Sequence, residues 1–160
     1  MLEQTAMFLN VPNSSSDSGT LQVQPRIGFT VKKVKTPQDI TLWIDVVMQA
    51  FGYSIDREVI ENLINDLDMQ LLMGCYNDQT IASAILYKTG DTIGIHQVGV
   101  KQDFQGKGFA RSFMKEIMAI CQLWQGKNIV LQASQSGKPL YESLGFTPQF
   151  LIKSYQKYWS

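Results

Sequence analysis

The chain has 160 residues, of which 44% are apolar, and both values are typical of a single globular domain with a sizeable core. Fourteen basic residues balance fourteen acidic ones, and no long run of either sign indicates a nucleic-acid or membrane surface. Cys75 and Cys121 lie in apolar segments without metal-ligand spacing, so we expect reduced core cysteines, no metal and a cytoplasmic location. The N-terminus lacks the basic region of an export signal, and no apolar run approaches the roughly 20 residues of a membrane span.

Residues 1–28 are expected to form an N-terminal extension. Residues 4–10 look like a lone strand, and residues 11–24 are rich in Ser, Asn, Asp and Gly, which is typical of a linker. The strand could pack on the edge of the sheet or pair across a homodimer, because an exposed sheet edge accepts another strand; a disordered tail is the alternative. The folded domain is expected to comprise residues 29–160.

A strand followed by two helices opens this domain. After the alternating segment FTVKKV, Thr36 is a candidate N-cap, with Asp39 in the capping-box position and Gly52 placed to end the helix. A second apolar stripe predicts a helix within residues 56–68.

Three strands come next, over residues 69–76, 80–88 and 92–100, the first two joined as a hairpin. Gly94 and Gly99 interrupt the third strand, which indicates a bulge or a close approach to the backbone; packing against a helix is the alternative.

The remaining elements complete an α/β (α+β) fold with a mixed sheet flanked by helices. An apolar stripe predicts a helix over residues 107–122, followed by a buried strand at 127–134, a short helix at 137–145 with Gly145 as its cap, and a last strand within 146–159.

The turn QGKGFARS (residues 105–112) joins a strand to a helix. A helix N-terminus exposes unpaired N–H groups and partial positive charge, and glycines allow an anion to approach them, so the turn could hold a phosphate. Its spacing matches neither a P-loop nor a dinucleotide fingerprint. A plain tight turn remains the alternative.

Two blocks of the sequence resemble the GNAT acetyltransferase superfamily. Gln105, Gly108 and Ala110 match its Gln/Arg-x-x-Gly-x-Gly/Ala signature after a strand ending VGV, and LQASQSGKPLYESLGF is similar to its second block. The resemblance covers roughly residues 29–156 and is closest to bacterial proteins without an assigned substrate. It implies a strand pair that splays at the cofactor site. The first 28 residues lie outside the usual minimal domain and resemble the end of an additional N-terminal half found in longer relatives.

The resemblance implies an acetyl-CoA site without a metal. The backbone of Gln105, Gly106, Lys107, Gly108, Phe109 and Ala110 would wrap the pyrophosphate, and Lys107 and Arg111 would add charge-assisted contacts. Val98, Gly99 and Val100 would pair with the pantetheine arm, and Gly99 would fit a bulge there. Ser134 would lie near the arm, although a strand-end cap is an equal alternative.

The implied reaction is attack of an amine on the thioester, with His96 and Tyr141 as catalytic candidates. A lysine-like amine is only about one part in a thousand neutral at pH 7, so a base is needed, and His96 has the appropriate pKa. A hydrogen-bonded structural histidine is the alternative. The N–H of Val98 or of its neighbour would hold the developing oxyanion, and Tyr141 would protonate the thiolate unless it merely packs on the short helix.

The expected function is therefore N-acetyltransferase activity on a small molecule or protein amine, without nucleic-acid or membrane partners. A non-catalytic acyl-CoA-binding module and an interaction domain are the alternatives. Tyr53 could line the acceptor pocket, as could Trp43 and Phe51, although the helical period favours the core for the last two.

Overall fold

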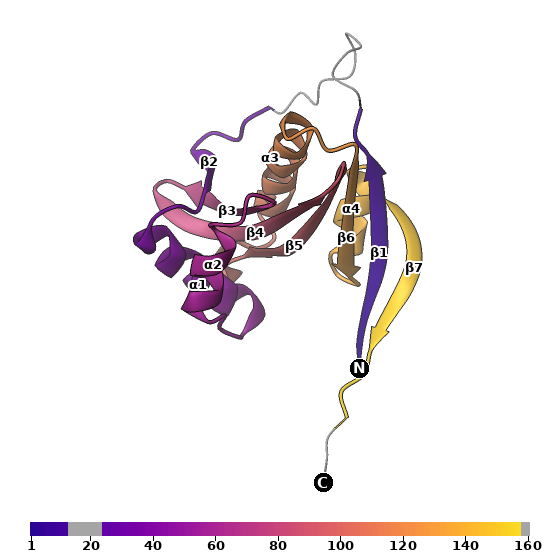
Figure 1. The fold of residues 1–160 in the computed structure, drawn as a ribbon, viewed down its shortest axis with the longest axis horizontal. Helices are drawn as coiled ribbons and strands as arrows, with labels where there is room; N and C mark the ends of the chain where they lie inside the picture. Colours follow the sequence, from indigo (N-terminus) through magenta and orange to yellow (C-terminus); the bar gives the residue numbers. More distant parts are fainter. Residues whose placement is uncertain (13–23, 158–160) are drawn as a thin grey trace.

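A computed structural model describes residues 1–12 and 24–157 of the chain, which form a mixed seven-stranded sheet with helices on both faces (Figure 1). The strands follow the order β2-β3-β4-β5-β6-β1-β7, and all neighbours are antiparallel except β5 and β6. The elements are β1 (Leu2–Asn10), β2 (Phe29–Lys33), α1 (Pro37–Phe51), α2 (Arg57–Leu63), β3 (Met69–Tyr76), β4 (Gln79–Thr89), β5 (Thr92–Val100), the 3-10 turn η1 (Gln102–Phe104), α3 (Phe109–Leu123), β6 (Asn128–Ser134), α4 (Lys138–Ser143) and β7 (Thr147–Ser154). The expected α/β fold is confirmed.

Helix α1 begins and ends where its sequence predicts. The Thr36 side chain accepts a hydrogen bond from the N–H of Asp39, and the Asp39 carboxylate accepts one from the N–H of Thr36, which completes a capping box. Gly52 ends the helix with a φ of 77°. These two caps fix where the C-terminal end of α1 meets the sheet.

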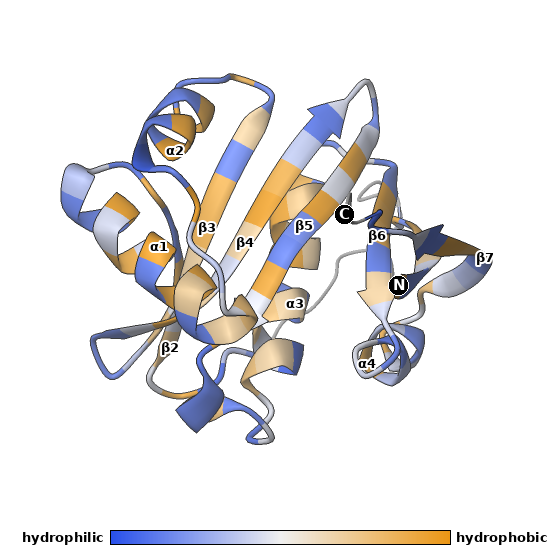
Figure 2. Ribbon diagram, turned by 90° about the horizontal axis from the view of Figure 1, so that it is seen from below, coloured by the Kyte–Doolittle hydropathy of each residue, from blue (hydrophilic) through white to orange (hydrophobic). Residues whose placement is uncertain are grey.

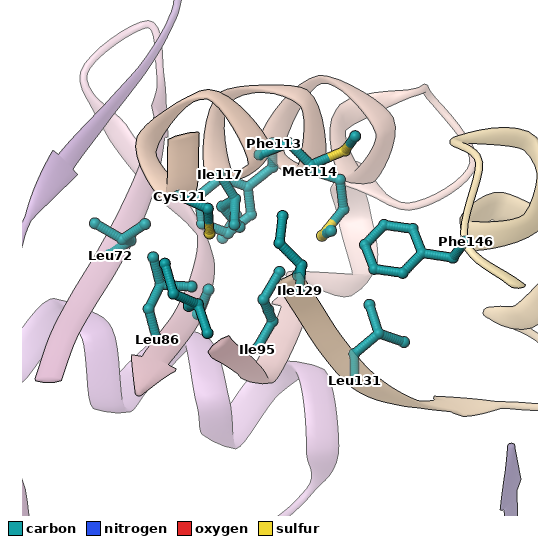
Figure 3. Close-up of a cluster of buried hydrophobic side chains, with 14 of the residues drawn as sticks. Leu72, Leu86, Ile95, Phe113, Met114, Ile117, Cys121, Ile129, Leu131 and Phe146 are labelled. Carbon is teal, nitrogen blue, oxygen red and sulfur yellow. The ribbon is translucent and has the colours of Figure 1, made fainter. Parts of the chain in front are cut away.

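The hydrophobic core is divided by the sheet into two layers. Helix α3 places Phe113, Met114, Ile117 and Cys121 against one face (Figure 3). On the other face, α1 and α2 pack on alternate residues of β3 and β4, with fully buried Trp43 at the centre. Side chains of a strand alternate between faces, so β3 contributes to both layers.

Strand β1 is not at the sheet edge, which corrects one expectation. It runs antiparallel to β6 on one side and to β7 on the other, so both of its backbone edges are paired within the chain (Figure 1). Met7, at its centre, is 1% exposed in the α3 core. Pairing of this strand across a dimer is therefore not needed to satisfy its backbone. Most of the expected linker, residues 13–23, lies outside the described residues.

Helix α2 is shorter than its apolar stripe indicates. It ends at Leu63, and Leu67, the last residue of the expected stripe, is 94% exposed. Asp66 accepts a hydrogen bond from the N–H of Asp68, a local turn that competes with a further helical turn. Helix α3 also begins two residues later than expected, at Phe109. None of the helices in the described ranges is long and apolar enough to span a membrane.

Candidate functional site

A β-bulge interrupts the pairing of β4 with β5. Ile85 pairs with His96 and Ser83 pairs with Gly99, so Gln97 and Val98 together lie opposite a single residue of β4. Gln97 has a φ of 54°, an uncommon value for a side chain of this type. The conformation is held by two hydrogen bonds, from Ser83 Oγ to the Gln97 carbonyl (3.1 Å) and from Tyr53 Oη to Gln97 Oε1 (2.9 Å).

The position of the bulge corrects the expectation for Gly99, which is paired with β4. A Cβ atom at Gly99 would lie 2.7 Å from Phe51 Cε2 and 2.8 Å from Ala50 Cβ. Gly99 is therefore required for the close approach of α1 to β5, as the packing alternative states. The approach also places Phe51 at the bulge, where it is 40% exposed, so its expected place in the core is wrong, whereas Trp43 is a core residue.

Strands β5 and β6 separate just before the bulge. Their parallel pairing extends only from Thr92 and Asn128 to Ile95 and Leu131, and beyond these residues the strands diverge (Figure 2). The splayed strand pair expected from the sequence is confirmed. The splay leaves the backbone of β5 at the bulge unpaired on the β6 side.

The glycine-rich turn lies at the C-terminal end of β5. Gly106 and Gly108 have φ values of 72° and 81°, and α3 begins at Phe109 without a side-chain cap. The first N–H groups of a helix have no acceptor within it, so this end of α3 presents donors and partial positive charge. Gln105 Nε2 donates to the carbonyl of Val100 (2.9 Å), which fixes the turn against the strand.

A cavity of about 560 Å³ extends from this turn into the splay between β5 and β6. It is lined by ten of the eleven residues expected to bind the cofactor: Val98, Gly99, Val100, Gln105, Gly106, Gly108, Phe109, Ala110, Arg111 and Ser134. Lys107 is the exception, because its ammonium turns away to donate to the carbonyl of Asp103 (2.9 Å).

A second cavity, of about 520 Å³, lies on the other side of the bulge. Both cavities are lined by Phe51, Val98, Ser134 and Tyr141, so they adjoin at these residues. His96 lines only the second cavity of the two. The two catalytic candidates are thus placed on one cavity, with Tyr141 at its junction with the other.

A family comparison shows to which family the chain belongs. The model of the acetyltransferase (GNAT) domain matches residues 31–154, more than half of the chain. The chain belongs to the GNAT acetyltransferase family. It is accordingly an acyltransferase, and the family uses acetyl-CoA as a cosubstrate. No curated protein matches the chain.

Solved structures of GNAT proteins share this fold at low identity. The ribosomal-protein-S18-alanine N-acetyltransferase of Escherichia coli is 18% identical, with a TM-score of 0.66 over 74% of this chain and 77% of that one. A GCN5-related N-acetyltransferase of Sphaerobacter thermophilus is 17% identical, with a TM-score of 0.74 over 94% of this chain but 49% of that one. A GNAT protein of Desulfovibrio desulfuricans is 17% identical, with a TM-score of 0.67 over 79% and 90% of the two chains. The chain spans about half the length of the Sphaerobacter thermophilus structure.

The donors around the first cavity fit the phosphates of the GNAT cosubstrate. Gly106 has no atom within 4 Å of where a Cβ would be, so an anion could approach the turn backbone closely there. Arg111 adds a fixed cation, because its Nη2 donates to Ser143 Oγ (2.6 Å) in α4. Ser134 Oγ accepts from the N–H of Gly137 (3.1 Å), so it holds the turn between β6 and α4 and also lines the cavity.

Burial shifts the pKa values of the two catalytic candidates in useful directions. Desolvation lowers the pKa of His96 below its ordinary 6.5, so the imidazole is neutral at pH 7. Desolvation raises the pKa of Tyr141 above 10, so its hydroxyl keeps its proton. One group can therefore accept a proton and the other can donate one.

Arg26 is a site residue that the sequence reasoning missed. Its Nη1 donates to the carbonyl of Lys107 (2.6 Å), and its guanidinium lies 3.8 Å from the centre of the Phe109 ring. The residue belongs to the N-terminal extension, 81 positions before its acceptor, and no local pattern marks it. It ties that segment to the glycine-rich turn.

Proposed function

We propose that the protein is an N-acetyltransferase that transfers the acetyl group of acetyl-CoA to a primary amine by direct attack in a ternary complex. The observation that carries this proposal is the pair of adjoining cavities at the splay of β5 and β6. One is lined by the glycine-rich turn and the other by His96, and Tyr141 lies at their junction. A cosubstrate in the first cavity and an acceptor in the second would meet beside Tyr141.

The cosubstrate is assigned to the first cavity by the groups that line it. The N–H groups at the start of α3 and the guanidinium of Arg111 would hold the pyrophosphate. On the β6 side, the unpaired backbone of Val98 and Gly99 would hydrogen-bond the amides of the pantetheine arm as an added strand would, whereas the Val100 carbonyl already accepts from Gln105 Nε2. Ser134 would lie beside that arm.

When bound, acetyl-CoA supplies a thioester carbonyl that an amine nitrogen can attack, with the thiolate of CoA as the leaving group. His96 accepts the proton that the nitrogen gives up, directly or through one water. The N–H of Val98 at the bulge donates to the carbonyl oxygen as negative charge develops on it. Tyr141 gives its phenolic proton to the departing sulfur and is reprotonated from solvent.

Binding of the cosubstrate is tested with a matched pair of glycine variants. Gly106→Ala and Gly90→Ala introduce the same methyl group at similar backbone angles, φ 72° and 60°, and neither new Cβ meets another atom within 4 Å. Only Gly106 lines the first cavity. We expect calorimetry to show acetyl-CoA binding at least tenfold weaker for Gly106→Ala and unchanged for Gly90→Ala. Equal affinities of all three proteins would remove the turn from the binding site.

Proton donation by Tyr141 is tested by removing only its hydroxyl. Tyr141→Phe is expected to slow CoA release with an acceptor by about 10²-fold while acetyl-CoA binding is retained, because positioned acids contribute at least that much. Tyr155→Phe is the control, since Tyr155 is 75% exposed and lines neither cavity. Full turnover in Tyr141→Phe would restrict the residue to packing, where its ring contacts Phe146.

A non-catalytic acyl-CoA-binding module is the alternative function. It requires only the turn and the splayed strands, not a base beside an acceptor cavity. It would show acetyl-CoA binding in calorimetry without CoA release in the presence of any amine. The neutral imidazole at the second cavity and the protonated phenol at the junction favour the enzyme.

A further inference from the structure

The second cavity, which is the acceptor cavity if the proposed function holds, has an uncharged lining. Amide side chains come from three strands, namely Gln4 of β1, Gln97 of β5 and Gln132 of β6, and aromatic rings come from Phe51 and Tyr53. Within the described residues no Asp, Glu, Lys or Arg lines it. An amine that remains cationic would find no carboxylate here, and a ligand carboxylate would find no cation.

An apolar groove continues this cavity along the outer face of the sheet. The groove has a volume of about 380 Å³ and shares His96, Leu131 and Gln132 with the acceptor cavity. Alternate residues of three strands form its floor: Ala6 and Phe8 of β1, Val130 of β6, and Phe150 and Ile152 of β7. Charged side chains are absent from this part of the described lining as well. Helices α1 and α2 pack on β3, β4 and β5, and among the described residues no helix covers this part of the sheet face (Figure 2).

Charge excludes several classes of acceptor. Polyamines and aminoglycosides carry several positive charges, which the uncharged cavity and groove would desolvate without compensation. A free amino acid carries its carboxylate within a few bonds of the amine, in a cavity without a cation. A peptide amino terminus carries its amine with neutral amides behind it, and glutamine side chains can both donate to and accept from such amides.

The pKa values of the base and of the possible acceptors also favour a peptide α-amino group. The imidazole of His96 is a weak base, because burial lowers its pKa below 6.5. An α-amino group has a pKa of roughly 7.7–8.0 and a lysine side chain about 10.4, so an imidazole can deprotonate the former far more readily. The amide-lined cavity has no negative charge that would hold the ammonium form.

From the uncharged cavity and the groove that continues it, we propose that the acceptor is the α-amino group of a peptide whose first residues are apolar. The amine lies at His96, and the second and third side chains lie along the groove over Phe8, Val130 and Phe150. In the reaction the C–N bond to the α-nitrogen forms and the C–S bond of acetyl-CoA breaks. His96 first takes a proton from the α-ammonium and releases it to solvent. The neutral amine then attacks, its second proton passes to His96, and the CoA sulfur gains a proton from Tyr141, which is reprotonated from solvent. This assignment rests on the proposed function.

In the experiment, the full chain is incubated with acetyl-CoA and each of four possible acceptors in turn. They are a heptapeptide with a free α-amine, Leu and Phe at its second and third positions and no lysine; the same peptide with Glu at both positions; an N-terminally blocked version carrying a lysine; and spermidine. Mass spectrometry locates the acetyl group. We expect the apolar peptide to be acetylated on its α-nitrogen with kcat/KM at least tenfold above each other probe. Preferred acetylation of the lysine peptide, the Glu peptide or spermidine would overturn the inference and leave the acetyltransferase intact.

A pair of variants on β7 tests the groove itself. Phe150 and Leu151 are 65% and 50% exposed, so Glu at either position should leave folding intact, and successive residues of a strand point to opposite faces. Only Phe150 lines the groove. In the presence of CoA, calorimetry should show the apolar peptide binding at least tenfold more weakly to Phe150→Glu and normally to Leu151→Glu. Equal peptide affinities for the two variants would overturn the groove assignment.

Measuring acetyl-CoA binding distinguishes a failure of the peptide assignment from a failure of the proposed acetyltransferase function. Both Glu variants should bind acetyl-CoA as the unaltered chain does, because neither position lines the first cavity. If the unaltered chain does not bind acetyl-CoA, the proposed function fails. If it binds acetyl-CoA but acetylates none of the four probes, the peptide assignment is wrong.

Discussion

At the scale of single residues, the candidate site depends on how burial shifts two pKa values in opposite senses. His96 loses part of its hydration and favours the neutral imidazole, and Tyr141 loses hydration and favours the neutral phenol. A proton acceptor and a proton donor therefore coexist at pH 7 on the same cavity. Tyr53, which also lines that cavity, is the one other titratable side chain among its described residues. No ion pair in this lining counteracts the effect of burial.

The pH profile is the first prediction at this scale. Because the pKa of His96 lies below 6.5, kcat at saturating acceptor should fall as the pH decreases through that pKa and His96 becomes protonated. Above pH 7 this group no longer limits the rate, and Tyr141 keeps its proton up to a pKa above 10. His96→Gln should lower kcat by about 10²-fold and abolish the acidic limb. The measurement is kcat between pH 5 and 9 for both proteins.

Acetyl-CoA affinity provides the control for this variant, since His96 does not line the first cavity and its replacement should leave that affinity unchanged. An acidic limb that persists in His96→Gln at the same midpoint would assign the titration to another group. His96 would then be a structural histidine whose ring lies over Gly94, where a Cβ would be 2.9 Å from its Nε2.

At the scale of elements, much of the fold follows from local patterns. The apolar runs predict β3 and β5 with their observed ends, and Thr36 with Asp39 predicts the start of α1, because each signal lies within the element it describes. The bulge at Gln97 has no such signal. A glutamine rarely adopts a positive φ, and what holds it there is a pair of hydrogen bonds from Ser83 and Tyr53, 14 and 44 residues away.

The same contrast applies to the candidate site. The glycine-rich turn is predictable because its spacing and its place before a helix are local. The orientation of Arg111 is not, because it depends on Ser143 of α4, 32 residues away, while Lys107 donates to the Asp103 carbonyl only four residues before it. Phe51 shows the limit of periodicity, which places a residue on one face of α1 but does not say where the sheet beneath that face ends.

The capping box of α1 supplies a prediction about stability. Burial alone would raise the Asp39 pKa, but hydrogen bonds from Lys32 Nζ and from the N–H groups of Thr36 and Lys35 outweigh it and lower the pKa to about 2. Asp39→Ala should reduce the free energy of unfolding by about 2 kcal/mol at pH 7. Because the folded pKa lies below the unfolded value, this contribution is complete above about pH 4 and is lost as the pH falls toward 2.

Urea unfolding of both proteins at pH 7 and at pH 2.5 measures the two differences. Asp45→Ala is the control on the same helix, since the Asp45 carboxylate is 48% exposed where it pairs with Lys101 and should contribute less than about 1 kcal/mol. A difference between Asp39→Ala and the unaltered chain that is equal at both pH values would exclude the carboxylate charge as the source of the stability.

At the scale of the whole molecule, the first strand of the sequence completes the far half of the sheet. The chain places β1 between β6 and β7, more than 100 residues away, and it carries Gln4, Ala6 and Phe8 onto the acceptor side. No local pattern in residues 2–10 could indicate this, because the register is set by which distant edges remain unpaired. The same strand turns Met7 inward against the α3 core. Removing β1 would therefore affect both stability and the acceptor cavity.

Because β1 is part of the sheet, we predict that its buried methionine contributes to the stability of the whole domain. Substitutions of a buried and an exposed methionine test this. Met7 is 1% exposed in the main core, whereas Met48 on α1 is 49% exposed. Met7→Ala should lower the free energy of unfolding by about 3 kcal/mol, because it creates a cavity in the layer shared with α3. Met48→Ala should change it by less than about 0.5 kcal/mol. Urea unfolding followed by tryptophan fluorescence should give one transition for each protein, with similar slopes and a lower midpoint for Met7→Ala alone.

The reason to expect a single transition is that β1 joins β7 to β6, so loosening it also uncouples the strand that carries Phe150. Coincident midpoints for the two variants would instead make residues 1–10 an appendage of the sheet, and residues 29–157 would then have to close the sheet without them.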